Sequence, residues 1–130
     1  MKKIILVSGD PNSINSEILF KSLKKLKKSI KKKIYLISNY KLIQEQLKKL
    51  NFSLKICKVK NLNDKNNESA LKILNVSLKF NKPFDVSFKN ASKFVINSID
   101  LAHNLSLNKN VLGLINCPIN KNLLKEKNIG

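Results

Sequence analysis

Hydrophobic and polar positions follow two patterns along this chain. Short continuous apolar runs led by β-branched residues are typical of strands that are buried on both faces. Apolar residues at three- to four-residue spacing, with Lys between them, are typical of amphipathic helices. The apolar runs predict strands at residues 3–8, 34–38, 53–59, 71–76 and 111–116. The helical spacing predicts helices at residues 16–30, 41–50, 87–107 and 121–127.

The apolar stripes of these helices predict which side chains face the sheet. In the first helix they are Ile18, Leu19, Leu23, Leu26 and Ile30. In the second they are Leu42, Ile43, Gln46, Leu47 and Leu50. In the long third helix they are Phe88, Ala91, Val95, Ile99, Ala102 and Leu105. Asn39 and Asn120 precede helices and can cap them, because an Asn side chain accepts hydrogen bonds from free backbone amides.

Strands and helices alternate, which indicates right-handed βαβ crossovers. We therefore expect the α/β class, with an open, mostly parallel sheet and flanking helices. The polar, Asn-rich residues 60–69 predict an exposed loop. With 130 residues, no internal repeat and no linker, the chain is expected to form a single α/β unit over residues 1–130.

The net charge of +18 suggests nucleic acid as a partner, because clustered Lys neutralises phosphate. Several features weaken that suggestion. All 26 basic residues are Lys, and Arg is the residue that reads guanine and phosphate bidentately. Aromatic residues make up only 6% of the chain. Lys, Asn and Ile, whose codons are rich in A and T, make up nearly half of it. A solvated Lys surface is therefore the favoured interpretation, and a small nucleic-acid-binding module is the alternative.

The remaining composition bounds the compartment and the redox chemistry. No apolar run approaches the roughly 18 residues that cross a membrane, and none resembles a secretory signal, so a cytoplasmic protein is expected. Cys57 and Cys117 form no CxxC pair and are expected to be small buried hydrophobes. His103 is the only His in the chain, which argues against a metal or acid–base role for it.

Ligands of open parallel sheets bind beyond the carboxyl ends of the strands, so the loops there are the candidate sites. The first loop follows residues 3–8 and contains Asp10, which can orient a ligand hydroxyl or simply form a turn before Pro11. Glu17 falls in the first turn of the next helix, where the helix dipole favours an acid. Neither a P-loop nor a GxGxxG motif is present.

The second loop follows residues 111–116 and leads into the last predicted helix. It contains Lys121 at the mouth of a predicted strand, a position that distinguishes it from the other lysines. Lys there can pair with a substrate phosphate or carboxylate as a flexible point charge.

The two loops together resemble the 4-hydroxythreonine-4-phosphate dehydrogenase family. VSGDPNSINSEI is similar to the family's GDPAGIGPE-like segment, and VLGLINCPINKNLLKEKNIG is similar to its strand and TAPINK-like segment. The positions that match are Gly9, Asp10, Pro11, Glu17, Pro118, Ile119, Asn120 and Lys121. The resemblance implies substrate-binding roles for Asp10, Asn120 and Lys121, with structural roles for Gly9, Pro11, Glu17 and Pro118. Ser13, Asn15, Ser16 and Cys117 depart from the family pattern.

The resemblance implies a longer parent enzyme, of which this chain would be the amino-terminal part. Such enzymes are similar in fold to isocitrate and isopropylmalate dehydrogenases and form homodimers. They oxidise 4-phosphohydroxy-L-threonine with NAD or NADP in pyridoxal 5′-phosphate (vitamin B6) biosynthesis, assisted by a divalent metal (Zn, Mg or Co). The family's metal-binding His residues follow the PINK motif, so the metal ligands are not in this chain, and the fragment alone is expected to be inactive.

Three alternatives remain open at this point. A related enzyme can act on phosphothreonate or phosphoerythronate. A degenerate family member can retain association without catalysis. The third is the small Lys-rich nucleic-acid-binding α/β module.

Overall fold

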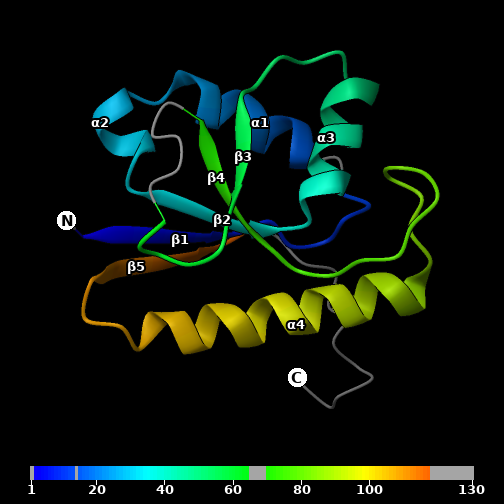
Figure 1. The fold of residues 1–130 in the computed structure, drawn as a ribbon. Helices are drawn as coiled ribbons and strands as arrows, with labels where there is room; N and C mark the ends of the chain where they lie inside the picture. The colour runs from blue at the N-terminus through cyan, green and yellow to red at the C-terminus, as the bar shows by residue number, and fades with distance from the viewer. Residues whose placement is uncertain (1, 14, 65–69, 118–130) are drawn as a thin grey trace.

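The computed structural model describes residues 2–13, 15–64 and 70–117, and they form one five-stranded sheet (Figure 1). The strand order is β3-β4-β2-β1-β5, and every pairing is parallel. The strands are β1 (Lys3–Val7), β2 (Ile34–Ser38), β3 (Ile56–Val59), β4 (Leu71–Asn75) and β5 (Val111–Asn116). The helices are α1 (Asn15–Lys25), α2 (Lys28–Lys31), α3 (Tyr40–Lys49) and α4 (Phe88–Ser106). The predicted α/β class and parallel sheet are confirmed.

The helix predicted over residues 16–30 is two helices in the structure. Lys27 has an extended backbone, with φ −63° and ψ 148°, and it separates α1 from α2. Lys residues lie three and four positions apart through this stretch, and like charges at that spacing destabilise a helix. The strand predicted to begin at residue 53 begins at Ile56, while β2 and β5 have the predicted bounds.

Helices cover the two faces of the sheet unequally. Figure 1 shows α1, α2 and α3 on one face and α4 alone on the other. Side chains of β1 alternate between two cores as the pleat requires: Ile5 and Val7 join the core under α4, and Leu6 joins the core under α1 and α3. A near-continuous apolar strand between two helical layers is what the sequence of β1 predicts.

The predicted facing residues are confirmed for most of α3 and only in part for α1. Gln46 and its apolar neighbours on α3 are buried. On α1, Leu23 is buried, but Ile18 is 62% exposed and Phe20 is fully buried. Ile30, which falls on α2, is exposed, so its predicted inward position is wrong. Positions two apart on a helix lie about 200° apart, so Ile18 and Phe20 cannot share a face. The stripe that passes through Phe20 and Leu23 is the one that packs on the sheet.

On α4 the buried stripe begins one turn later than predicted. Ala91, Val95 and Ala102 are buried, as the spacing predicts. Phe88, the first residue of the helix, is 52% exposed, so its predicted inward position is wrong. Phe94 is fully buried beside the predicted stripe, which widens the apolar face of α4.

The last predicted strand is not buried, because β5 is an edge of the sheet. Only β1 pairs with it within the described residues. Leu114 pairs in register with Ile5, and Ile115 pairs with Leu6, so their side chains lie on opposite faces. Leu112, Leu114 and Ile115 are 65%, 39% and 54% exposed. The edge therefore presents apolar side chains on both faces together with backbone groups available for pairing.

A buried amide ties α3 to the end of β4. Asn39 caps α3 as predicted, because its Oδ1 accepts a hydrogen bond from the Leu42 N–H at 3.0 Å. Its Nδ2 donates to the Val76 carbonyl at 2.8 Å. The side chain is only 7% exposed, so removing it would leave buried backbone groups without partners.

We predict that Asn39→Ala lowers the free energy of unfolding by about 2–4 kcal/mol, the sum of a lost cap and a buried carbonyl left unpaired. Urea denaturation followed by circular dichroism measures the change. Asn104→Ala, on the exposed surface of α4, is the matched control and should stay within about 0.5 kcal/mol of the native chain. An Asn39→Ala variant as stable as this control would show that the two hydrogen bonds of Asn39 do not stabilise the fold.

We also predict that the 130-residue chain self-associates through β5. Ile115→Lys should weaken the association by about tenfold or more, because burying an Ile side chain in the contact contributes about 1.5–3 kcal/mol. Sedimentation analysis over a concentration series at about 0.15 M salt measures it. Ile18→Lys adds the same charge at an exposed helical Ile and should have little effect. Equal effects of the two variants would show that charge, and not the strand edge, controls association.

Candidate functional site

Loops from four strands meet at the carboxyl edge of the sheet. They are residues 8–13 after β1, 38–40 after β2, 76–78 after β4, and Asn116–Cys117 at the end of β5. The chain leaves β2 for α3 on one face and leaves β4 for α4 on the other (Figure 1). Adjacent strands whose connections diverge in this way define the crevice where ligands of open α/β sheets bind. We call this set of loops the carboxyl-edge site.

The loop after β1 turns sharply at Gly9. This residue is buried with φ 80°, a conformation that costs an L side chain energy and costs Gly none. The Asp10 carboxylate then accepts a hydrogen bond from the Asn12 N–H at 2.9 Å, and its carbonyl oxygen accepts one from the Ser13 N–H at 3.2 Å. The turn-forming role of Asp10 is thus observed, and Pro11 is buried beside it.

Two amide side chains hold the β1 loop from opposite sides. Asn12 forms a pair of hydrogen bonds with Val86: its Nδ2 donates to the Val86 carbonyl, and its Oδ1 accepts from the Val86 N–H, both at 2.8 Å. Buried Gln46 of α3 donates from Nε2 to the Pro11 carbonyl at 2.9 Å. Sequence reasoning missed Asn12. Its only signal was an Asn in a loop after a buried strand, and 19 Asn residues in the chain obscure that signal.

Hydroxyl and amide groups connect the neighbouring strands across the same edge. The Ser8 and Ser38 hydroxyls, at the ends of β1 and β2, form a hydrogen bond of 3.0 Å. The Asn75 Oδ1 at the end of β4 accepts from the Tyr40 N–H at 2.8 Å. Polar groups therefore connect β1 to β2 and β2 to β4 at this edge and fix the positions of the loops.

The departures from the family pattern cause no backbone strain at Ser13. Asn51 and Phe84 are the only non-Gly residues with positive φ in the part of the chain that the structure describes. Ser13 thus has an ordinary backbone, and its carbonyl accepts from the Ser16 N–H at 3.3 Å, just as α1 begins. Glu17, in the first turn of α1, forms an exposed ion pair with Lys21 at 3.3 Å.

The thiols are half-buried, and neither forms a disulfide. Cys57 packs against the core under α4, and Cys117 packs against the core under α1 and α3. The Cys117 N–H donates to the Val7 carbonyl at 3.0 Å, so the end of β5 lies directly beside the end of β1. Burial raises the pKa of the Cys117 thiol, which keeps it protonated near neutral pH. It is not an activated nucleophile.

Several candidate residues lie outside the described residues. They are Pro118, Ile119, Asn120 and Lys121, together with the helix predicted over residues 121–127. His103 is exposed on α4. Among residues 2–13, 15–64 and 70–117, no three His, Cys, Asp or Glu side chains are grouped so that they could hold a metal ion. None of the helices described is both long enough and apolar enough to cross a membrane.

Comparison by sequence finds no relative, since no family model and no curated protein matches the chain. Comparison by structure finds 4-hydroxythreonine-4-phosphate dehydrogenases. The enzyme from Klebsiella pneumoniae aligns with a TM-score of 0.81 and 19% identity over 97% of this chain. A proposed enzyme of this type from Salmonella typhimurium aligns over 97% of this chain with a TM-score of 0.81 and 17% identity. The enzyme from Burkholderia phymatum aligns over 96% of this chain with a TM-score of 0.67 and 16% identity.

The shared region is a part of these proteins. This chain covers 40% of the Klebsiella and Salmonella chains and 39% of the Burkholderia chain. At 16–19% identity the likeness is one of fold. The chain is thus similar in fold to about two fifths of a 4-hydroxythreonine-4-phosphate dehydrogenase, the family that its two loop motifs resemble.

Proposed function

We propose that this chain is the amino-terminal part of a cytoplasmic, NAD(P)-dependent and divalent-metal-dependent dehydrogenase that oxidises 4-phosphohydroxy-L-threonine, and that the carboxyl-edge site forms one wall of its active site. One observation carries the proposal. The two motifs are about a hundred residues apart in sequence, yet Val7 and Asn116 pair in register, so the strands that precede the two motifs end at the same edge of the sheet. The fold is the one that solved enzymes with this activity in their names share.

In this proposal the chain's own residues bind and orient the substrate. Lys121 pairs with the substrate phosphate, since an ammonium group is a flexible partner for a phosphate dianion. Asn120 and the Asp10 oxygen that is not engaged with the Asn12 N–H would orient the hydroxyl groups. Gly9 and the amide clamp formed by Asn12 and Gln46 keep the loop rigid, which favours a reactive alignment of substrate.

In this proposal the metal and the nicotinamide cofactor are held by residues outside those that the structure describes. The described residues offer no group of metal-ligating side chains, so an ion would take its ligands from outside them. When bound, such an ion supplies Lewis-acid polarisation of the reacting oxygen. The exposed apolar side chains of β5 support a role for another element that packs against this strand, because an edge strand of this kind is stabilised when it is covered. The remaining polypeptide would cover β5 and complete a homodimeric enzyme.

The test uses the product of the complete reading frame that contains these residues. We expect it to reduce NAD or NADP in the presence of 4-phosphohydroxy-L-threonine and a divalent metal, and to lose activity in chelator. Absorbance at the wavelength of the reduced nicotinamide measures turnover. Phosphothreonate and phosphoerythronate are assayed in parallel, and a preference for either would replace the proposed substrate by that sugar acid. No turnover with any of the three would overturn the proposal.

Within that enzyme, we predict that Lys121→Met raises the KM for the phosphorylated substrate by about tenfold to a hundredfold, because a hydrogen bond to a charged group contributes about 1.5–3 kcal/mol. Lys125→Met, which removes the same charge four residues later, is the control and should leave the KM within about twofold. Steady-state kinetics at fixed cofactor measures both. Equal KM values for the two variants would remove the phosphate-binding role from Lys121.

A further inference from the structure

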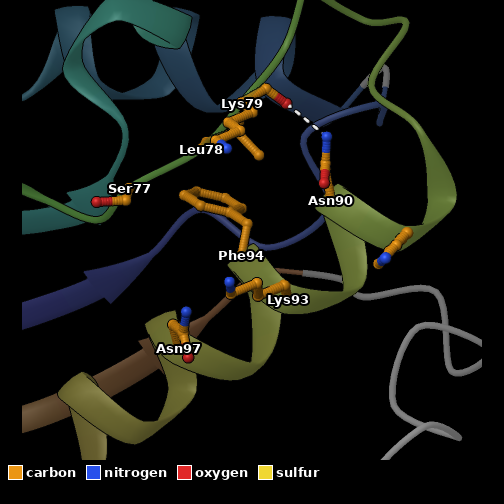
Figure 2. A pocket seen from close by; sticks show the side chains of 8 residues that line it. Ser77, Leu78, Lys79, Asn90, Lys93, Phe94 and Asn97 are labelled. Carbon is orange, nitrogen blue, oxygen red and sulfur yellow. Dashed lines mark hydrogen bonds between the residues drawn. The ribbon is translucent and has the colours of Figure 1, made fainter.

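A cavity lies beside α4 and shares only Ser77 and Leu78 with the carboxyl-edge site. It lies between the segment that follows β4 and the first half of α4, is open to solvent on one side, and has a volume of about 320 Å³. Figure 2 shows the side chains from the two elements facing each other across it. The lining residues are Ser77, Leu78, Lys79, Lys89, Asn90, Lys93, Phe94 and Asn97. We call it the α4 cavity.

The floor of the α4 cavity is apolar and fixed. Phe94 is fully buried, and its ring lies between α4 and Leu78 in Figure 2. Asn90 donates from Nδ2 to the Lys79 carbonyl at 3.1 Å, which holds the segment after β4 against the helix. Because a core side chain and a hydrogen bond fix both walls, the cavity exists before any ligand enters it.

The rim of the α4 cavity is cationic, with three Lys and no acidic residue in its lining. Lys89 and Lys93 are four residues apart on α4, where like charges repel. They also lie in its first two turns, near the positive end of the helix dipole. No ion pair is found for Lys79, Lys89 or Lys93 within the described residues. The three lysines are exposed at the rim, and a bound anion would offset the repulsion between Lys89 and Lys93.

We propose that the α4 cavity binds an organic phosphomonoester, with the phosphate dianion among Lys79, Lys89 and Lys93 and the organic group against Leu78 and Phe94. A chain with 26 Lys places some lysines near any cavity. What distinguishes this one is the combination of cations, an apolar floor and amide groups at Asn90 and Asn97 that can bond hydroxyls or phosphate oxygens. A dianion matches three cations better than a single carboxylate does.

The test of this cavity is independent of the proposed dehydrogenase activity. The α4 cavity shares Ser77 and Leu78 with the carboxyl-edge site, but Asp10, Asn12 and Gln46 do not line it. Its test uses the 130-residue chain and measures binding alone, so its failure leaves the dehydrogenase proposal untouched, and the reverse is also true.

The experiment titrates the ¹⁵N-labelled chain with phenyl phosphate at about 0.15 M salt, where weak surface charge effects are screened. We expect chemical-shift changes concentrated in residues 77–79 and 89–97, and binding at least about tenfold tighter than that of inorganic phosphate, which lacks the apolar group. Shifts spread over lysines of the whole surface, or equal affinity for the two probes, would overturn the proposal.

A matched pair of variants separates the cavity from general charge. Lys89→Gln/Lys93→Gln should weaken phenyl phosphate binding by about tenfold or more. Lys24→Gln/Lys28→Gln removes the same charge from exposed positions near α1 and α2 and should change the affinity by less than about twofold. Equal loss in both double variants would overturn the proposal, and unchanged urea midpoints show that each variant is folded.

Discussion

The parallel pairing of β1 with both of its neighbours is the constraint on which the rest of the molecule depends. β1 lies between β2 and β5, so the β1 loop and the end of β5 leave the sheet at one edge. The bond from the Cys117 N–H to the Val7 carbonyl continues the ladder to the last described residue. In parallel strands, the side chains of two residues that pair in register point to the same face of the sheet. The register therefore also decides which side chains of β5 lie beside Ile5 and Leu6.

Side-chain amides then bond the backbone groups of the loops, which the hydrogen bonds between strands do not reach. A loop after a strand has amide and carbonyl groups that need partners, and buried ones cost energy when unpaired. Asn12, Asn39 and Gln46 each bond backbone groups of a segment distant in sequence. A composition rich in Asn thus has a structural use here, because a short amide can donate and accept at once. The same bonds keep the carboxyl-edge site rigid.

Local pattern predicts much of this fold because each strand and helix has a clear periodicity. The bounds of β2 and the cap at Asn39 are determined by neighbouring residues, and both were predicted. The position of β5 at an edge is decided by which other strands are present, so an apolar sequence alone cannot distinguish it from a central strand. For the site, the sharp turn at Gly9 could be predicted, whereas the bonds between Asn12 and Val86 join residues 74 positions apart and leave no periodic signal.

The lysine excess also affects the interior. Lys3 and Lys72 are 6% and 1% exposed, with their Nζ atoms 5.5 and 4.8 Å from the centre of the Tyr35 ring. Lys72 donates to the Lys32 carbonyl at 2.7 Å, and Lys3 donates to a backbone carbonyl of the loop after β3. A long aliphatic stem packs like an apolar side chain while its ammonium group reaches an aromatic face or a carbonyl. Lysine at a strand position is therefore compatible with this core, and net charge by itself says little about function. The position of a lysine relative to apolar and polar neighbours is what gives it a role, as in the α4 cavity.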